Sequence, residues 1–130
     1  MDIVHLLFSF EGRIRRLHYW LAAISVGVVV GVVGSVLAPM SGMAQGTPNP
    51  IFMGLLAIIY IVDLYIGLAL GAKRCHDRDK SAWFLAIGLI PIIGAIWLFI
   101  ELGFLDGTQG PNRFGPSPKG IGGPVIAPAV

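Results

Sequence analysis

The 130-residue sequence is 55% hydrophobic and only 12% charged, whereas globular proteins usually contain roughly 25% charged residues. This composition excludes an ordinary soluble domain, which needs polar side chains on the outer face of every element, and it is typical of an integral membrane protein. The length predicts one domain over residues 1–130. The net charge of +2 comes from cations that flank apolar segments, which favours anionic lipid headgroups as partners and not nucleic acid.

The chain opens with a short amphipathic segment at residues 2–10. Its larger apolar side chains fall on one face of a helix, and they are Ile3, Leu6, Leu7 and Phe10. We expect such a helix to lie in the headgroup plane of a membrane.

Three apolar stretches follow, at residues 19–38, 51–71 and 83–104. About 20 apolar residues in a helix cross ~30 Å of hydrocarbon, so each stretch is long enough to span a membrane. The stretches are continuously apolar and do not alternate with polar residues, which favours helices over strands. The sequence therefore predicts an all-α membrane protein with three transmembrane helices.

The third stretch contains Pro91, with Gly94 three residues later. A proline removes one backbone hydrogen bond, so we expect the third helix to be kinked at this point. Beyond the third stretch the chain is rich in glycine and proline, which predicts an irregular tail over residues 105–130.

Small residues four positions apart occur in the first two stretches, as Gly27 with Gly31 and Gly67 with Gly71. In lipid, helices pair through close backbone approach, which such glycines permit. Packing within the chain is the favoured interpretation, and contact between copies of the chain is the alternative.

The distribution of lysine and arginine predicts the orientation of these helices. Seven cations precede the first stretch or lie between the second and third, and the loop at residues 39–50 has none. Because cytoplasmic loops are enriched in cations, we place the N-terminus and the loop at residues 73–80 in the cytoplasm. Three full spans then place the C-terminal tail on the outer side of the membrane.

Asp63 is a carboxylate deep inside the second predicted span. Placing its charge in the membrane costs at least ~2.5 kcal/mol, so we expect the side chain to face other helices and find a partner, or to stay protonated. Such an acid indicates a proton or cation step by default. Because the spans offer no relay of further polar groups, a structural hydrogen bond is the favoured interpretation.

The densest polar segment is residues 73–80. His76 beside Asp77 suggests a general base or a metal ligand, but no second histidine or cysteine lies nearby at ligand spacing. We therefore expect a hydrogen-bonded structural loop, and we predict no catalytic residue, metal or cofactor.

Two pairs of arginines flank the membrane on the same predicted side. Arg13 and Arg16 precede the first stretch, and Arg74 and Arg78 follow the second. With the polar loop they form a candidate site for an anionic lipid headgroup, because the guanidinium fork matches phosphate oxygens. The favoured alternative is that these cations only set the topology.

Four segments carry a recognisable pattern of residues, and they are the run from Phe10 to Trp20, the run from Arg74 to Trp83, Pro91 with Gly94, and the tail from Gly107 to Pro118. In order and spacing these segments resemble the signatures of the domain-of-unknown-function 805 family, which consists of small bacterial inner-membrane proteins. Asp79 stands where the family usually has a glycine. The resemblance implies residence in a bacterial inner membrane and no established activity.

The tail motif Asn112–Arg113 can share one site with Arg13 and the His76–Asp77 pair only if all of them lie on the same side of the membrane. Three full spans exclude this, because they place the tail in the periplasm. A re-entrant hairpin at Pro91 would return the tail to the cytoplasm, but it would leave backbone groups unpaired in lipid. Because residues 83–104 match one span in length, three spans remain the prediction.

These features favour a non-enzymatic membrane protein that acts by contact, as an accessory subunit or an envelope organiser. The expected partners are anionic lipids, a larger membrane complex or further copies of the chain. The alternatives are an oligomeric transporter or channel component that uses Asp63, and a membrane-interface enzyme that uses His76 and Asp77.

Overall fold

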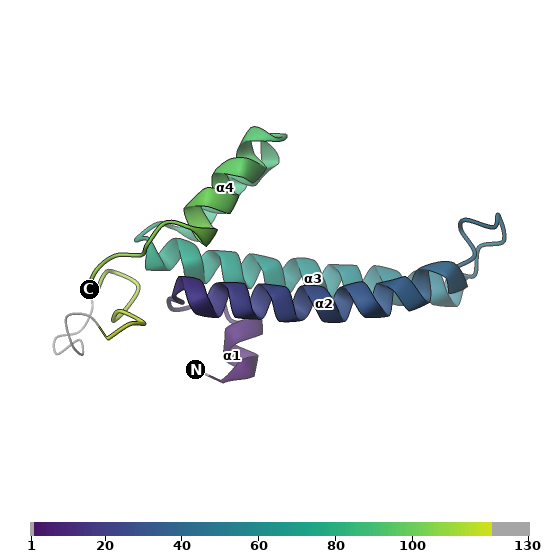
Figure 1. The fold of residues 1–130 in the computed structure, drawn as a ribbon, viewed down its shortest axis with the longest axis horizontal. Helices are drawn as coiled ribbons and strands as arrows, with labels where there is room; N and C mark the ends of the chain where they lie inside the picture. The colour runs from purple at the N-terminus through teal and green to yellow at the C-terminus, as the bar shows by residue number, and fades with distance from the viewer. Residues whose placement is uncertain (1, 121–130) are drawn as a thin grey trace.

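Two long antiparallel helices, α2 (Arg16–Met40) and α3 (Pro50–Asp77), lie side by side along the molecule (Figure 1). A computed structural model describes residues 2–120, and the regular elements within this range are all helices, with no strand. With 25 and 28 residues, the helices are roughly 38 and 42 Å long, more than the ~30 Å of hydrocarbon in a bilayer. Both are long and apolar enough to cross a membrane, as the sequence predicts for these two stretches.

Most of the apolar surface of these two helices is exposed. On α2 only Ala22 and Gly34 are buried, while Val28, Val32 and Val36 remain 58–60% exposed. A helix that is apolar on all sides and is not covered by its own chain is suited to a lipid or protein environment and not to water.

Only part of the predicted glycine packing forms within the chain. A Cβ placed on Gly27, Gly31 or Gly67 would meet nothing within 4 Å. Gly71 does pack closely, because a Cβ there would lie 3.0 Å from Leu85. The expectation that Gly27 and Gly31 pack against another helix of the same chain is therefore wrong.

The third apolar stretch forms two short helices and not the single kinked helix that the sequence predicts. The 3₁₀ helix η1 (Ala82–Leu89) is followed by a turn and by α4 (Ile93–Gly103), which packs back against η1. In Figure 1, α4 is inclined to the α2–α3 pair. Its last turn lies near the end of α3, and its first turn lies farther from the pair.

Pro91 and Gly94 make this reversal possible. Pro91 lies in the turn, where Ile92 adopts a positive φ of +66°. A Cβ on Gly94 would overlap the backbone of Ile87, so only glycine lets α4 approach η1 this closely. The two residues therefore allow a hairpin, where the sequence predicts a kinked helix.

The hairpin returns the chain to the end of α3. The tail over residues 105–120 is irregular, as predicted, and it lies at the same end of the helix pair as the N-terminal segment (Figure 1). The expectation that tail and N-terminus lie at opposite ends is wrong, and the hairpin alternative describes the arrangement. Residues 121–130 of the predicted tail lie outside the described residues.

The amphipathic segment at the N-terminus forms the short helix α1 (Ile3–Phe8), which lies on one side of the helix pair and projects away from it (Figure 1). The Asp2 side chain caps it by accepting from the His5 backbone N–H at 2.7 Å. The Tyr65 hydroxyl donates to the Phe8 carbonyl at 2.8 Å and so attaches the helix to α3.

Candidate functional site

The last residue of α3, Asp77, lies at the centre of a buried polar cluster. Its side chain is 3% exposed. Oδ1 accepts from Arg13 Nε at 3.1 Å and from Arg13 Nη2 at 3.0 Å, and Oδ2 accepts from Arg74 Nη1. One carboxylate thus serves two buried arginines, and the other donors of both guanidinium groups need further acceptors.

Arg13, which lies just before α2, directs its remaining donors at the tail. Nη1 donates to the carbonyls of Gly110 at 2.8 Å and Gly115 at 3.1 Å, and Nη2 donates to the carbonyl of Thr108 at 2.9 Å. With its two bonds to Asp77, the guanidinium uses all five of its N–H donors. Arg13 therefore ties the N-terminal segment, α3 and the tail together.

Arg74, one turn before Asp77 on α3, connects the cluster to the hairpin. It is fully buried, and Nε donates to the Leu102 carbonyl at 2.7 Å while Nη2 donates to the Leu105 carbonyl at 2.7 Å. Leu102 is near the end of α4, where helix carbonyls lack intrahelical partners. The third contact, from Nη1 to the Ile14 carbonyl at 3.2 Å, reaches the segment before α2.

The tail closes directly over Asp77. The Thr108 backbone N–H donates to the Asp77 carbonyl at 2.6 Å. A Cβ on Gly107 would overlap the Asp77 carboxylate, so this approach requires glycine. Asn112 holds the next part of the tail, because its Nδ2 donates to the His76 carbonyl at 2.9 Å.

The ring of His76 lies at the edge of the cluster. Its Nδ1 is 2.9 Å from the Gly12 carbonyl, and because a carbonyl only accepts, this nitrogen carries the proton. The Phe114 ring of the tail stacks on the imidazole, with centroids 4.1 Å apart and an interplanar angle of 7°. The histidine is thus held in place by one hydrogen bond and one aromatic stack.

Lys73 is fully buried, although the sequence pattern assigns it no special role. Its Nζ donates to the carbonyls of His5 at 3.1 Å, Leu6 at 2.6 Å and Ser9 at 2.6 Å. The ammonium group therefore uses its three donors to cap the C-terminal end of α1. Only the docking of α1 on α3 gives the lysine this function, so no local pattern could have revealed it.

A second ion-pair group joins the hairpin to the end of α3. Glu101 of α4 is 5% exposed, and its Oε1 accepts from Arg78 Nε at 2.9 Å and from Lys80 Nζ. The Lys80 ammonium also lies 4.3 Å from the centre of the Phe84 ring in η1. A single third helix would carry Glu101 away from these cations, and the reversal of the chain brings it back to them.

Polar contacts on the rim complete this end of the molecule. Arg16 Nη1 donates to the Phe104 carbonyl at 2.6 Å, and Arg113 Nη2 donates to the Asp79 carbonyl at 3.0 Å. The hydrogen bond from Lys119 lowers the pKa of the exposed Asp106 carboxyl below its ordinary value.

Asp63 lies apart from the cluster, in the middle of α3. It lines two hollows beside α2 and α3, with volumes of about 410 and 480 Å³. The carboxylate makes no hydrogen bond or ion pair with any residue in the range 2–120. The partner expected from the sequence is therefore absent from the described part of the chain.

The structure gathers most of the predicted site residues at one place, and these are Arg13, Arg74, His76, Asp77 and Asn112. Arg16, Arg78 and Arg113 lie on the rim. Within residues 2–120, no three His, Cys, Asp or Glu side chains are grouped to hold a metal ion. The donors of both central arginines are directed at the chain's own carbonyls and at Asp77, so the cluster is arranged to hold the N-terminal segment, α3, α4 and the tail together.

Comparison with known proteins identifies the family. Residues 7–116 match the family described as Protein of unknown function (DUF805). The chain belongs to this family. The match confirms the resemblance found over residues 10–118, including the tail that closes the cluster.

The curated relatives are similar in length to this chain. The inner membrane protein YhaH of Escherichia coli is 38% identical over 113 residues, which cover 85% of this chain and 88% of YhaH. The inner membrane protein YhaI of the same organism is 31% identical over 113 residues, covering 85% and 86%. The uncharacterized protein YiiR of Escherichia coli is 29% identical over an alignment of 146 positions, which covers 93% of each chain. No solved structure was found to match.

Proposed function

We propose that this DUF805 protein is a non-enzymatic, multi-pass protein of the bacterial inner membrane that acts by contact, as an accessory subunit or an envelope organiser. One observation carries the proposal. The functional groups of Arg13, Arg74 and Asp77 make their contacts within the chain, whereas the apolar faces of α2 and α3 are exposed. The surface that is available to a partner is therefore the one inside the membrane.

The contact proposal is tested by cross-linking in native membranes. We expect dimers or larger species in the wild type, and several-fold less of them in Gly31→Leu. A side chain at Gly31 meets nothing within 4 Å in its own chain, so this variant should block only approach from outside. Val32→Leu is the matched control, because Val32 is 60% exposed on the same helix. Finding only the monomer and no partner, in the wild type as in both variants, would reject the proposal.

The arrangement of cations supports a topology with two spans and a hairpin. All nine lysines and arginines lie at one end of the helix pair, and the loop at residues 41–49 has none. We therefore place this end in the cytoplasm, with α2 and α3 crossing the membrane. The η1–α4 hairpin then enters the lipid from the cytoplasmic side and returns to the same side.

Reporter fusions test this topology. A reporter that is active only in the cytoplasm should be active after the tail and inactive when inserted in the 41–49 loop. A tail reporter active only in the periplasm would instead support three spans.

A second candidate is an oligomeric transporter or channel component that uses Asp63. The observation in its favour is that the carboxylate faces two hollows and has no partner within residues 2–120. Proton or cation flux in proteoliposomes should then fall in Asp63→Asn, and unchanged flux would remove this candidate. The enzyme alternative is less favoured, because Asp77 accepts from two arginines and His76 Nδ1 is committed to Gly12.

A further inference from the structure

We propose that the η1–α4 hairpin binds one anionic phospholipid, with an acyl chain in a groove on α4 and the phosphate at Arg78 and Lys80. This inference deepens the proposed membrane role and rests on the topology proposed above. It concerns a surface separate from the buried Asp77 cluster and from the open faces of α2 and α3.

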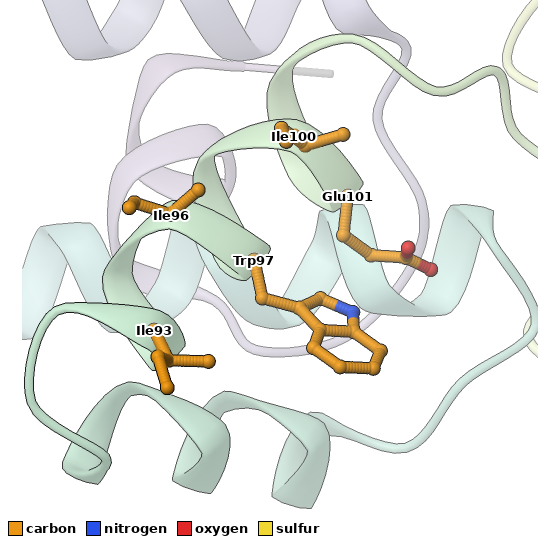
Figure 2. Close-up of a pocket in the computed structure, with 5 residues that line it drawn as sticks. All are labelled: Ile93, Ile96, Trp97, Ile100 and Glu101. Atoms are coloured by element: carbon orange, nitrogen blue, oxygen red, sulfur yellow. The ribbon is translucent and has the colours of Figure 1, made fainter.

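The groove is apolar along nearly all of its length. It has a volume of about 390 Å³ and is lined by Ile93, Ile96, Trp97, Ile100 and Glu101. Figure 2 shows Trp97 and Glu101 reaching out on the same side of α4, as residues four apart on a helix do. The indole is 53% exposed, so it forms an open wall that a flexible chain can cover.

The groove has one apolar end and one charged end. Ile93 lies beside the turn at the tip of the hairpin, and Glu101 lies in the last turn of α4, next to the end of α3. In the proposed topology the Ile93 end is deep in the lipid and the Glu101 end is at the headgroups. A phospholipid has the same polarity along the same direction.

The charge at the headgroup end also fits a phosphate. Arg78 and Lys80 share the single carboxylate of Glu101, which leaves a net charge of +1. Arg78 Nη2 has no hydrogen-bond partner within residues 2–120, and Lys80 Nζ has only Glu101 as an acceptor there. Glu101 thus positions both cations, and unused donors remain for phosphate oxygens.

A phospholipid meets both requirements of this site at once. Water-soluble phosphate would satisfy the cations but would leave the groove uncovered, and an uncharged lipid would fill the groove but leave the net charge unpaired. The proposed occupant therefore carries an acyl chain and a net negative headgroup, as phosphatidylglycerol does.

Quenching of Trp97 fluorescence by brominated lipids tests this proposal. The full-length protein is placed in phosphatidylcholine vesicles that contain a small, equal fraction of brominated phosphatidylglycerol or brominated phosphatidylcholine. The signal of Trp97 is the difference between wild type and Trp97→Phe. We expect the brominated phosphatidylglycerol to quench this signal more strongly than the brominated phosphatidylcholine.

Variants of Lys80 separate a site from general attraction to a charged surface. Lys80→Gln should weaken the phosphatidylglycerol preference roughly five-fold, since one cation near the membrane surface is worth about 1 kcal/mol. Lys80→Arg should retain the preference. Lys119→Gln removes the same charge at the same end of the molecule and should leave the preference unchanged.

Two results would overturn the site. One is equal quenching by both lipids in the wild type, which would show that any lipid or another helix covers the groove. The other is an equal loss of preference in Lys80→Gln and Lys119→Gln. Either result leaves the cross-linking experiment on α2 unaffected, so failure of the lipid site and failure of the contact proposal can be distinguished.

Discussion

The polar end of the molecule and the middle of the α2–α3 pair use the same residue types in opposite ways. At the polar end, Gly107 touches the carboxylate of Asp77, which two arginines hold. In the middle of the pair, Gly27 faces open space and the carboxylate of Asp63 has no partner within residues 2–120. The comparison indicates that the polar end fixes the structure of the monomer, and that the middle is left for lipid or another protein.

The energetics of the two regions explain this division. Burying Arg13, Lys73 and Arg74 is costly unless each donor is paired, so the polar end is stable only when all of its segments are in place. In the middle of the pair no such requirement exists, because lipid is as apolar as the side chains that it meets. Substitutions should therefore have large effects at one end and small effects in the middle.

Asp77→Asn is expected to have the largest effect. It removes the one carboxylate that both buried arginines share, and loss of one partner from a buried ion pair costs about 3–5 kcal/mol. Thermal unfolding in detergent should show a strongly lowered Tm. Asp79→Asn is the control, because its carboxylate is exposed and pairs only with Arg113 on the rim. Equal stability of the two variants would contradict the central place of Asp77.

Lys73→Met should have the next largest effect, and a local one. The variant leaves three carbonyls at the end of α1 without their donor, which weakens this contact by about 1–3 kcal/mol. Hydrogen exchange of the backbone amides in residues 3–9 should accelerate, while exchange in α3 changes little. Lys119→Met, in the tail, should leave α1 protected. Unchanged exchange in α1 would show that other contacts hold it.

A pair of glycine substitutions measures the contrast between the two regions directly. Gly107→Ala should cost about 1–3 kcal/mol of stability, because the new methyl group overlaps the Asp77 carboxylate. Gly27→Ala should be neutral or stabilising by about 0.5–1 kcal/mol, because alanine favours the helix and meets no neighbour. Comparison of the two Tm values against wild type checks both expectations. A similar loss in both variants would remove the distinction.

The two long helices are predictable from the sequence, and the hairpin is not. Continuous apolar runs of span length admit few alternatives to a helix in lipid, which is why α2 and α3 form as expected. The stretch at residues 83–104 has the same length and apolarity whether it forms one helix or two short ones. What decides between them is the contact of Gly94 with Ile87, which exists only after the chain has reversed.

The candidate site was predictable as a set of residues but not as a geometry. The sequence indicates Arg13, Arg74, Asp77 and Asn112, and it raises the question of whether they share one side of the membrane. Because three spans are predicted, the tail is assigned to the wrong end, and the carbonyl acceptors of Arg13 cannot be identified. Lys73 stays unnoticed for the same kind of reason, since its partners are backbone atoms of a distant helix.

The smallest predicted effect concerns Asp79, at a position where the resemblance to the family implies a glycine. Asp79 has a φ of +58°, so the left-handed turn is present even though the residue is an aspartate. Asp79→Gly relieves about 1 kcal/mol of backbone strain, which the greater freedom of glycine in the unfolded chain partly offsets. The variant also loses the ion pair with Arg113, but this pair is exposed and contributes little to stability. Unfolding of Asp79→Gly in detergent should therefore give a Tm equal to or slightly above that of the wild type.

The matched variant Asp79→Ala keeps the backbone strain but lacks the ion pair, so its Tm should lie below that of Asp79→Gly. The reverse order would mean that the carboxylate of Asp79, and not its backbone conformation, is what this turn requires.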